Sequence, residues 1–223
     1  MISVFVSLFP VMFLSVIASY LVGSVPTGYW FAKYIFNIDI TKSGSGNIGA
    51  TNVARVLGKK YFALIFLIDF LKAFFTLYLI RALVDSTIIL TWFEYSGLEF
   101  AGFECDFIQK ILIFDAMALL IGNAYSIFLK FNGGKGVATT VGVLAYLFPF
   151  KLLLVFGCLW LFTVAATRRP FIASLVAIYL SCLVYYFYFL QNNNVQGNNC
   201  LFYLLVFICF WLTIRHRSNF KQI

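Results

Sequence analysis

Seven runs of apolar residues, separated by short polar or charged segments, divide this chain from end to end. The runs are rich in Phe, Leu, Ile and Val and cover residues 2–22, 61–84, 111–129, 137–149, 152–167, 171–190 and 201–214. A helix of about 20 apolar residues crosses a hydrocarbon core of about 30 Å. Only 11% of the residues are charged, against about a quarter in soluble domains. We therefore predict a single all-α membrane domain, residues 1–223, with seven transmembrane helices. The fourth and seventh runs are short for a full crossing, since about 14 residues rise only about 21 Å as a helix.

The distribution of lysine and arginine predicts the orientation of these spans, because short cytoplasmic loops are enriched in both residues. In a seven-span topology, one side carries Lys33, Lys42, Arg55, Lys59, Lys60, Lys130, Lys135, Arg168, Arg169, Arg215, Arg217 and Lys221. The other side has only Arg81, Lys110 and Lys151, together with an acidic segment between residues 85 and 106 and an Asn-rich loop after Leu190. We expect the N-terminus outside and the C-terminus in the cytoplasm. The +8 formal charge then indicates a cytoplasmic face and anionic ligands, and we expect no nucleic-acid partner.

The first polar stretch, residues 41–55, reads TKSGSGNIGATNVAR. It combines glycines with small polar residues: Gly44, Ser45, Gly46, Asn47, Gly49, Thr51 and Asn52. Backbone N–H groups of such a loop can approach an anion closely because glycine has no Cβ. A helix beginning near Ala50 would add its N-terminal dipole, and Arg55 a bidentate guanidinium. The alternative is an ordinary polar turn between two helices.

This loop also fits the dinucleotide pattern GxGxxG, with Asp69 twenty residues after Gly49. That pattern needs a preceding strand and a βαβ unit, whereas Asp69 lies within the apolar run LIFLIDFLKAFF. Asp69 and Lys72 share one helix face, so we predict a structural ion pair in the membrane, with a direct catalytic role as the alternative.

The second polar stretch, residues 130–140, reads KFNGGKGVATT. Gly133, Gly134 and Gly136 surround Lys135, and a helix start bearing Thr139 follows. Leu129 and Gly136 stand where an ATP-binding P-loop needs a glycine and a Ser or Thr, so ATP hydrolysis is not supported. A second anion-binding loop is the preferred interpretation, and a tight turn with one solvated lysine is the alternative.

The third stretch is the basic C-terminus, RHRSNFK at residues 215–221. Such a cluster is typical of a topology anchor or a headgroup contact. His216 and Asn219 lie three residues apart on one helical face, where both can reach the same ligand as the two loops. We expect no metal and no cofactor, because one histidine, scattered acids and cysteines within apolar runs form no metal-binding pattern.

Together these motifs resemble the bacterial acyl-phosphate:glycerol-3-phosphate acyltransferase family, the PlsY type. The resemblance runs through GSVPTG, GSGNIGATNVARVLGKK, LIDFLKAFF, FLKFNGGKGVATTVG and IRHRSN, in order and over nearly the whole chain. It implies a seven-helix enzyme that transfers an acyl group from acyl phosphate to the 1-hydroxyl of glycerol 3-phosphate. The expected partners are these two substrates and membrane lipids, with the protein as a monomer.

The resemblance also implies roles for individual residues. We expect Arg55, Lys135 and His216 with Asn219 to hold the two phosphates, and Ser45 with backbone N–H groups to orient the glycerol and the acyl carbonyl. The base is expected to be His216 or the phosphate of the substrate. Two departures stand out, since Asn123 replaces a family histidine and Ser218 a family glutamate. Two other functions remain open: a transporter or flippase for an anionic metabolite or lipid, and a degenerate structural membrane protein.

Overall fold

The computed structural model describes residues 2–86, 103–187 and 198–220, and every regular element within them is a helix. The elements are α1 (Ile2–Ser24), α2 (Thr27–Phe36), η1 (Ile40–Lys42), α3 (Ala50–Leu57), α4 (Tyr61–Val84), α6 (Phe103–Ala124), η2 (Ile127–Leu129), α7 (Val137–Leu147), α8 (Phe150–Thr167), α9 (Pro170–Tyr185) and α10 (Asn198–Phe220). The predicted all-α class is confirmed, and each of the seven apolar runs contains a helix. Residues 87–102 of the predicted acidic segment and residues 191–197 of the Asn-rich loop lie outside the described residues.

Four described helices are long and apolar enough to cross a membrane: α4, α6 with its extension to Leu129, α8 and α10. From Pro10 onward, α1 forms with α2 a pair bent by 40°, which has the length and hydropathy of a broken span or a re-entrant loop. The remaining apolar helices, α7 and α9, have 11 and 16 residues. The last helix is longer than its apolar run, because Arg215, His216 and Arg217 continue it beyond Ile214.

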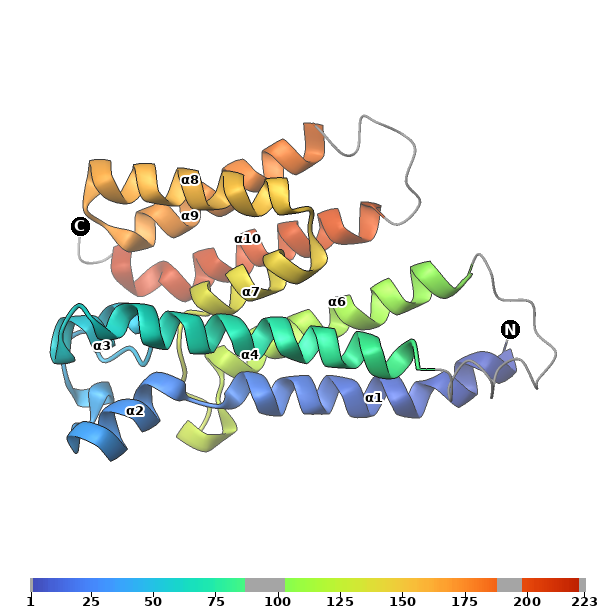
Figure 1. The fold of residues 1–223 in the computed structure, drawn as a ribbon, viewed down its shortest axis with the longest axis horizontal. Coiled ribbons are helices and arrows are strands. Elements are labelled where there is room, and N and C mark those ends of the chain that lie inside the picture. Colours follow the sequence, from blue (N-terminus) through green and yellow to red (C-terminus); the bar gives the residue numbers. More distant parts are fainter. Residues whose placement is uncertain (1, 87–102, 188–197, 221–223) are drawn as a thin grey trace.

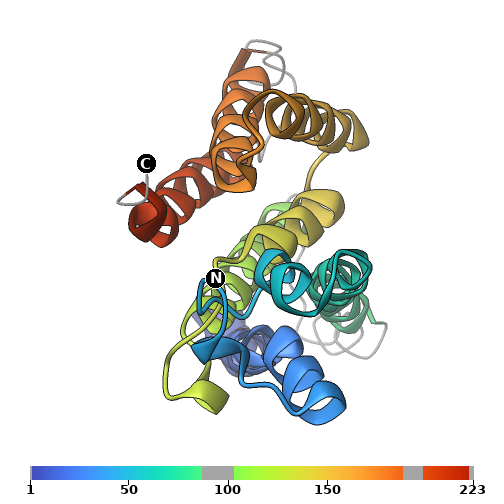
Figure 2. The ribbon, with the colours of Figure 1, turned by 90° about the vertical axis from the view of Figure 1, so that its left-hand side faces the viewer.

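The helices form two groups side by side. Figure 2, viewed from the end that carries α3, shows α1, α2, α4 and α6 in one group, α8, α9 and α10 in the other, and α7 between them. Within these groups α1 packs on α6, α4 on α7, and α8 on α9. Small residues allow the closest contacts: a Cβ at Gly122 would lie 2.2 Å from the Tyr20 carbonyl oxygen, and one at Gly142 would lie 2.4 Å from the Phe70 oxygen. Such close backbone approach is typical of helix pairs in membranes.

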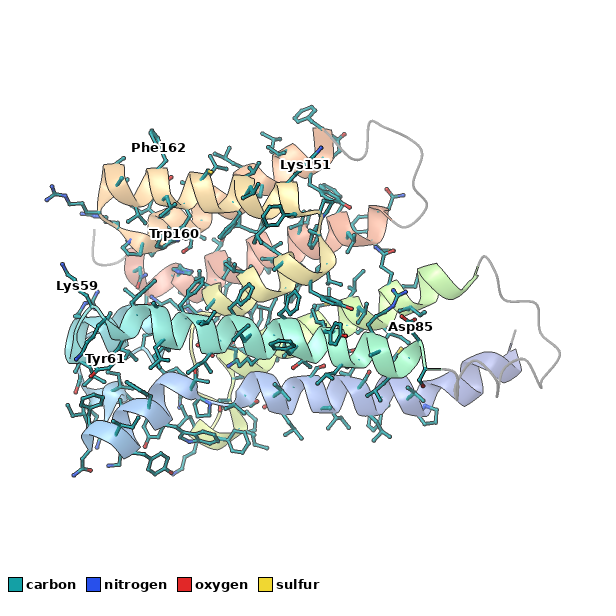
Figure 3. All side chains as sticks on the ribbon, in the orientation of Figure 1. Lys59, Tyr61, Asp85, Lys151, Trp160 and Phe162 are labelled. Carbon is teal, nitrogen blue, oxygen red and sulfur yellow. The ribbon has the colours of Figure 1, made fainter. Side chains whose placement is uncertain are left out.

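Charged residues separate along the long axis of the bundle. Lys59 lies at one end, whereas Asp85 and Lys151 lie toward the other (Figure 3). The loops before α4, before α7 and before α9 and the C-terminal end of α10 all lie toward the end that carries α3 (Figure 1). These segments hold eight of the twelve cations that we assigned to one side: Lys59, Lys60, Lys130, Lys135, Arg168, Arg169, Arg215 and Arg217.

One buried acidic group lies between α1 and α6, away from that end. Asp115 is fully buried and accepts hydrogen bonds from Ser19 at 2.9 Å and from Ser15 at 3.2 Å. A polar contact of this kind joins helices where the surroundings offer no water.

Candidate active site

A cavity of about 350 Å³ opens at the end of the bundle that carries α3, between the two helix groups. Its polar lining consists of Thr27, Ser45, Asn47, Thr51, Asn52, Arg55, Asp69, Asn123, Lys135, Thr139, Arg168, Arg169, Ser174, His216 and Asn219. Its apolar lining includes Phe62, Phe66, Val137, Trp160 and Phe171. A cationic polar surface and an aromatic surface therefore meet in one cavity.

The first glycine loop, within residues 41–55, is built around the side chain of Asn52, which is 2% exposed. Its Oδ1 accepts a hydrogen bond from the Ser45 N–H at 2.8 Å. Its Nδ2 donates to three carbonyl oxygens, those of Asn47 at 2.8 Å, Ser43 at 3.0 Å and Ile40 at 3.3 Å. Both N–H groups of the amide are used within the loop, so Asn52 shapes the loop from within.

Gly44 and Gly46 give this loop its turn, with φ of +60° and +71°. These left-handed values favour glycine, and a Cβ at Gly44 would lie 2.3 Å from Asn52 Oδ1. Ahead of the turn, the Thr41 hydroxyl and N–H donate to the Asp39 carboxylate, and the hydroxyl contact contributes most to lowering the pKa of Asp39. Gly44 and Gly46 are thus needed for loop shape, and neither lines the cavity.

The second glycine loop, within residues 130–140, lies directly on the end of α6. The Gly134 N–H donates to the Asn123 carbonyl oxygen at 2.8 Å. A Cβ at Gly133 would lie 2.3 Å from that oxygen and 2.6 Å from the carbonyl oxygen of Ala124. Gly133 therefore allows close packing and does not line the cavity, and the N–H of Gly134 already has a partner.

Arg215 holds this loop in place from α10. Its Nη2 lies 3.2 Å from the Ala124 carbonyl oxygen, 3.0 Å from that of Gly134 and 3.5 Å from that of Gly133. Its guanidinium lies 5.0 Å from the centre of the Tyr125 ring. Arg215 is half-buried and contacts this loop through its guanidinium, in addition to the positive charge that it adds to this end of α10.

Three helices begin at the cavity wall, and none has a side-chain hydrogen bond capping its N-terminus. Ala50 and Thr51 open α3, Val137 and Ala138 open α7, and Pro170 and Phe171 open α9, and all of them line the cavity. The first N–H groups of a helix have no partner within it, and its dipole places partial positive charge there. Three such ends around one cavity make an anion site independent of any side chain.

Lys135 and Asn219 meet across the cavity, with Lys135 Nζ donating to Asn219 Oδ1 at 2.5 Å. Burial, together with the positive charges of Arg215 and Arg55, lowers the pKa of Lys135 to about 8. Next to this pair, Nδ1 of the buried His216 lies 2.8 Å from the Leu212 carbonyl oxygen. Because a carbonyl oxygen only accepts, Nδ1 carries the proton and Nε2 of the neutral ring is an acceptor.

The predicted ion pair of Asp69 and Lys72 is present, with 2.7 Å between Oδ1 and Nζ. The Thr27 hydroxyl also donates to Asp69 Oδ1, at 2.8 Å. Lys72 Nζ donates further to the carbonyl oxygens of Gly23 and Val25, at the break between α1 and α2. Asp69 and Thr27 line the cavity, so the pair joins the helix break to the site.

Most of the residues predicted for the site come together in the cavity. Those that line it are Ser45, Asn47, Gly49, Thr51, Asn52, Arg55, Gly134, Lys135, Gly136, Thr139, His216 and Asn219. Sequence reasoning did not assign Thr27, Asn123, Trp160, Arg168 or Phe171 to it. The signals for them were the motif GSVPTG for Thr27, the replaced family histidine for Asn123 and the double arginine at the end of an apolar run for Arg168. Among the described residues, no cluster of three or more His, Cys, Asp or Glu side chains is placed to hold a metal.

Comparison with known proteins is consistent across sequence and structure. The family model for glycerol-3-phosphate acyltransferase matches residues 13–223. A glycerol-3-phosphate acyltransferase of Aquifex aeolicus is 36% identical over 208 residues, which cover 93% of each chain. One from Thermosipho melanesiensis is 32% identical and covers 94% of this chain and 87% of its own length.

Two solved structures are similar along almost the whole chain. Both are crystal structures of PlsY, an integral membrane glycerol 3-phosphate acyltransferase, one in its glycerol 3-phosphate form and one in its lysophosphatidic acid form. The TM-scores are 0.73 and 0.72, at 32% sequence identity. Each alignment covers 95% of this chain and 90% of the other.

Proposed function

Because this chain belongs to the glycerol-3-phosphate acyltransferase family, we propose that it uses an acyl phosphate as donor and acylates the 1-hydroxyl of sn-glycerol 3-phosphate. The products are lysophosphatidic acid and inorganic phosphate. The observation that carries this proposal is the cavity in which Arg55, Lys135 and three helix N-termini face an aromatic surface. Two phosphate groups and one acyl chain need that combination of positive charge and apolar contact.

The cations of the cavity bring two anions together. Arg55 lines it from α3, Arg168 from the end of α8 and Lys135 from the second glycine loop. Positive charge offsets the repulsion between two phosphates and fixes the reacting groups in position. Ser45, Asn47 and Thr51, at the start of α3, contact the substrates, while Asn52 keeps that loop in shape.

The reaction itself is a direct acyl transfer. The 1-hydroxyl oxygen of glycerol 3-phosphate attacks the acyl carbonyl carbon, and a new C–O bond forms. The bond between that carbon and the phosphate oxygen breaks, and the phosphate leaves with the bonding electron pair. Nε2 of His216 accepts the hydroxyl proton, since hydrogen bonding at Nδ1 leaves it as the acceptor. Lys135 and Asn219 orient the leaving phosphate.

The enzyme is an integral membrane protein, and we assign its seven crossings to α1, α4, α6, α7, α8, α9 and α10. The N-terminus is outside, and the cavity and the C-terminus face the cytoplasm of the inner membrane. This orientation is supported by the cationic loops at the cavity end. Residues 1–223 act as one domain and as a monomer, because residues of a single chain surround the cavity. The acyl chain lies along Phe62, Phe66 and Trp160, between α4 and α8.

The test is an assay of purified protein with palmitoyl phosphate and labelled glycerol 3-phosphate, scoring lysophosphatidic acid and released phosphate. We expect both products in equal amounts, and none from palmitoyl-CoA under the same conditions. Boiled protein is the control. Folded protein that forms product from palmitoyl-CoA and none from palmitoyl phosphate would overturn the donor assignment.

A further inference from the structure

Asn123, at the end of α6, is a polar residue of the cavity that the reaction described above does not use. It is 7% exposed and lines the cavity beside the second glycine loop. Its carbonyl oxygen accepts the Gly134 N–H, so the backbone of Asn123 positions the loop whatever its side chain does.

The orientation of its side-chain amide follows from Lys72. Lys72 Nζ lies 3.2 Å from the amide oxygen Oδ1, and an ammonium group can only donate. Oδ1 therefore faces Lys72, and Nδ2 points to the opposite side. Lys72 is itself held by Asp69 and by the carbonyl oxygens of Gly23 and Val25.

The other side of the amide faces the second glycine loop and the start of α7. A Cβ would lie 3.1 Å from Asn123 Nδ2 if built on Gly134 and 3.5 Å if built on Gly136. Both glycines line the cavity, and their lack of a side chain leaves this amide uncovered. Within the described part of the chain, no hydrogen bond from Nδ2 to a protein acceptor is present.

A second polar group without a partner lies in the same wall. The hydroxyl of Thr139, which is 1% exposed, has no hydrogen-bond partner in the described protein. Thr139 is in the first turn of α7 and lines the cavity. Buried polar groups are almost always hydrogen-bonded, so the uncovered Nδ2 of Asn123 indicates a ligand, and the enclosed Thr139 hydroxyl shows that the protein leaves this wall incompletely hydrogen-bonded.

We propose that Nδ2 of Asn123 donates a hydrogen bond to a phosphate oxygen of a substrate bound at the second glycine loop and the start of α7. Lys72 acts as a positioning residue that fixes which face of the amide meets the substrate. The phosphate belongs either to glycerol 3-phosphate or to acyl phosphate. This inference rests on the proposed function, since it adds a binding residue to the same reaction.

Two variants and one matched control test the proposal. Asn123→Ala removes the donor and leaves Lys72 three acceptors for its three protons, so the fold is retained. Asn123→Asp keeps an oxygen toward Lys72 and replaces the donor by an anionic oxygen. The control is Asn132→Asp, which adds the same charge at an exposed position in the same stretch. KM and kcat are measured for glycerol 3-phosphate and palmitoyl phosphate separately, together with the melting temperature.

We expect Asn123→Ala to raise KM for one of the two substrates by about tenfold, the effect of one lost hydrogen bond to a charged group. Asn123→Asp should raise the same KM further, because it adds repulsion, and Asn132→Asp should leave both KM values within about twofold of wild type. The substrate whose KM responds is the one bound at this loop. Unchanged KM values in Asn123→Ala and Asn123→Asp, with only a lower melting temperature, would assign Asn123 a structural role and overturn the proposal.

A binding measurement tests the same proposal if a variant turns over too slowly for its KM values to be measured. Inorganic phosphate should raise the melting temperature of wild-type protein and of Asn132→Asp, and raise that of Asn123→Asp far less. Equal stabilisation of all three proteins would contradict the inference. Wild-type protein that binds phosphate without making lysophosphatidic acid would instead count against the proposed function alone.

Discussion

Lys135 Nζ donates a hydrogen bond to Asn219 Oδ1, and 84 positions of sequence separate the two residues. The contact joins the second glycine loop to the last turns of α10, and both residues line the cavity. One cation and one amide are thereby fixed in orientation before a substrate binds, which lowers the entropy lost on binding.

Replacing Lys135 by methionine should lower kcat/KM by about 100-fold, because the cavity loses a cation and Asn219 loses its partner. The side-chain volume is similar, so the melting temperature should change little. Lys130→Met, at an exposed position five residues earlier, is the matched control and should keep normal activity. Normal turnover by Lys135→Met would exclude Lys135 from phosphate binding.

Substrate binding should take up protons near pH 8.5. Burial lowers the pKa of Lys135 to about 8, so above that pH the free protein holds mostly neutral lysine. A phosphate monoester, with a second pKa of about 6, arrives as a dianion and raises the pKa of Lys135 again. Calorimetric titration with glycerol 3-phosphate in buffers of different ionisation enthalpy measures this uptake.

The uptake should be small at pH 6.5, where Lys135 is already protonated, and absent at pH 8.5 in Lys135→Met. The affinity of wild type should also fall as pH rises from about 8 to 10. Affinity that is flat across this range would show that Lys135 stays charged or does not meet the phosphate.

Asn52→Ala should release the first glycine loop. The variant removes one acceptor and the donor of three hydrogen bonds that hold residues 40–47 together. We expect faster amide exchange in residues 43–49 and a loss of kcat/KM of about tenfold or more. Asn132→Ala, on the exposed surface, is the control. Unchanged exchange at the Ser45 amide would show that the loop does not depend on Asn52.

Arg215→Met should lower stability, whereas Arg217→Met should not. Arg215 donates to the carbonyl oxygens of Ala124 and Gly134, and its loss removes a donor from these two buried residues. We expect a loss of about 1–3 kcal/mol in the free energy of unfolding, together with lower activity. Arg217 is exposed two positions further along the same helix, so it controls for net charge. Equal thermal stability of the two variants in detergent would show that Arg215 does not stabilise the second glycine loop.

Gly122→Ala should weaken the contact between α1 and α6. A Cβ there would lie 2.2 Å from the Tyr20 carbonyl oxygen, and relieving this overlap costs about 1–3 kcal/mol. Gly157→Ala on α8 is the matched control, because a Cβ there meets nothing within 4 Å. It should be neutral or should stabilise by up to about 1 kcal/mol through helix propensity. Melting curves of the two variants give the comparison.

The helices could be predicted from sequence because lipid selects continuous apolar runs. The predicted run 61–84 coincides with α4, and the chemistry of the two glycine loops was visible in their composition. The end of α10 was placed too early, since charged residues end an apolar run without ending a helix.

The internal roles of Asn52 and Gly133 could not be predicted, because they depend on which backbone groups approach them. Asn52 was expected to bind substrate, and the structure shows in addition that its side-chain amide holds the loop together. Asn123 was visible only as a replaced histidine. Its orientation comes from Lys72, 51 residues away, and such a distant partner leaves no pattern in one sequence.

The convergence of α3, α7 and α9 at the cavity has a consequence for how the protein tolerates change. Peptide dipoles carry no proton that can be lost, have no rotamer to order and cannot be removed by replacing a side chain. The backbone conformation itself therefore supplies part of the attraction for phosphate. Single replacements of Arg55, Lys135 or Arg168 should each lower the affinity for phosphate only in part. Only a change that moves a helix start should abolish phosphate binding entirely.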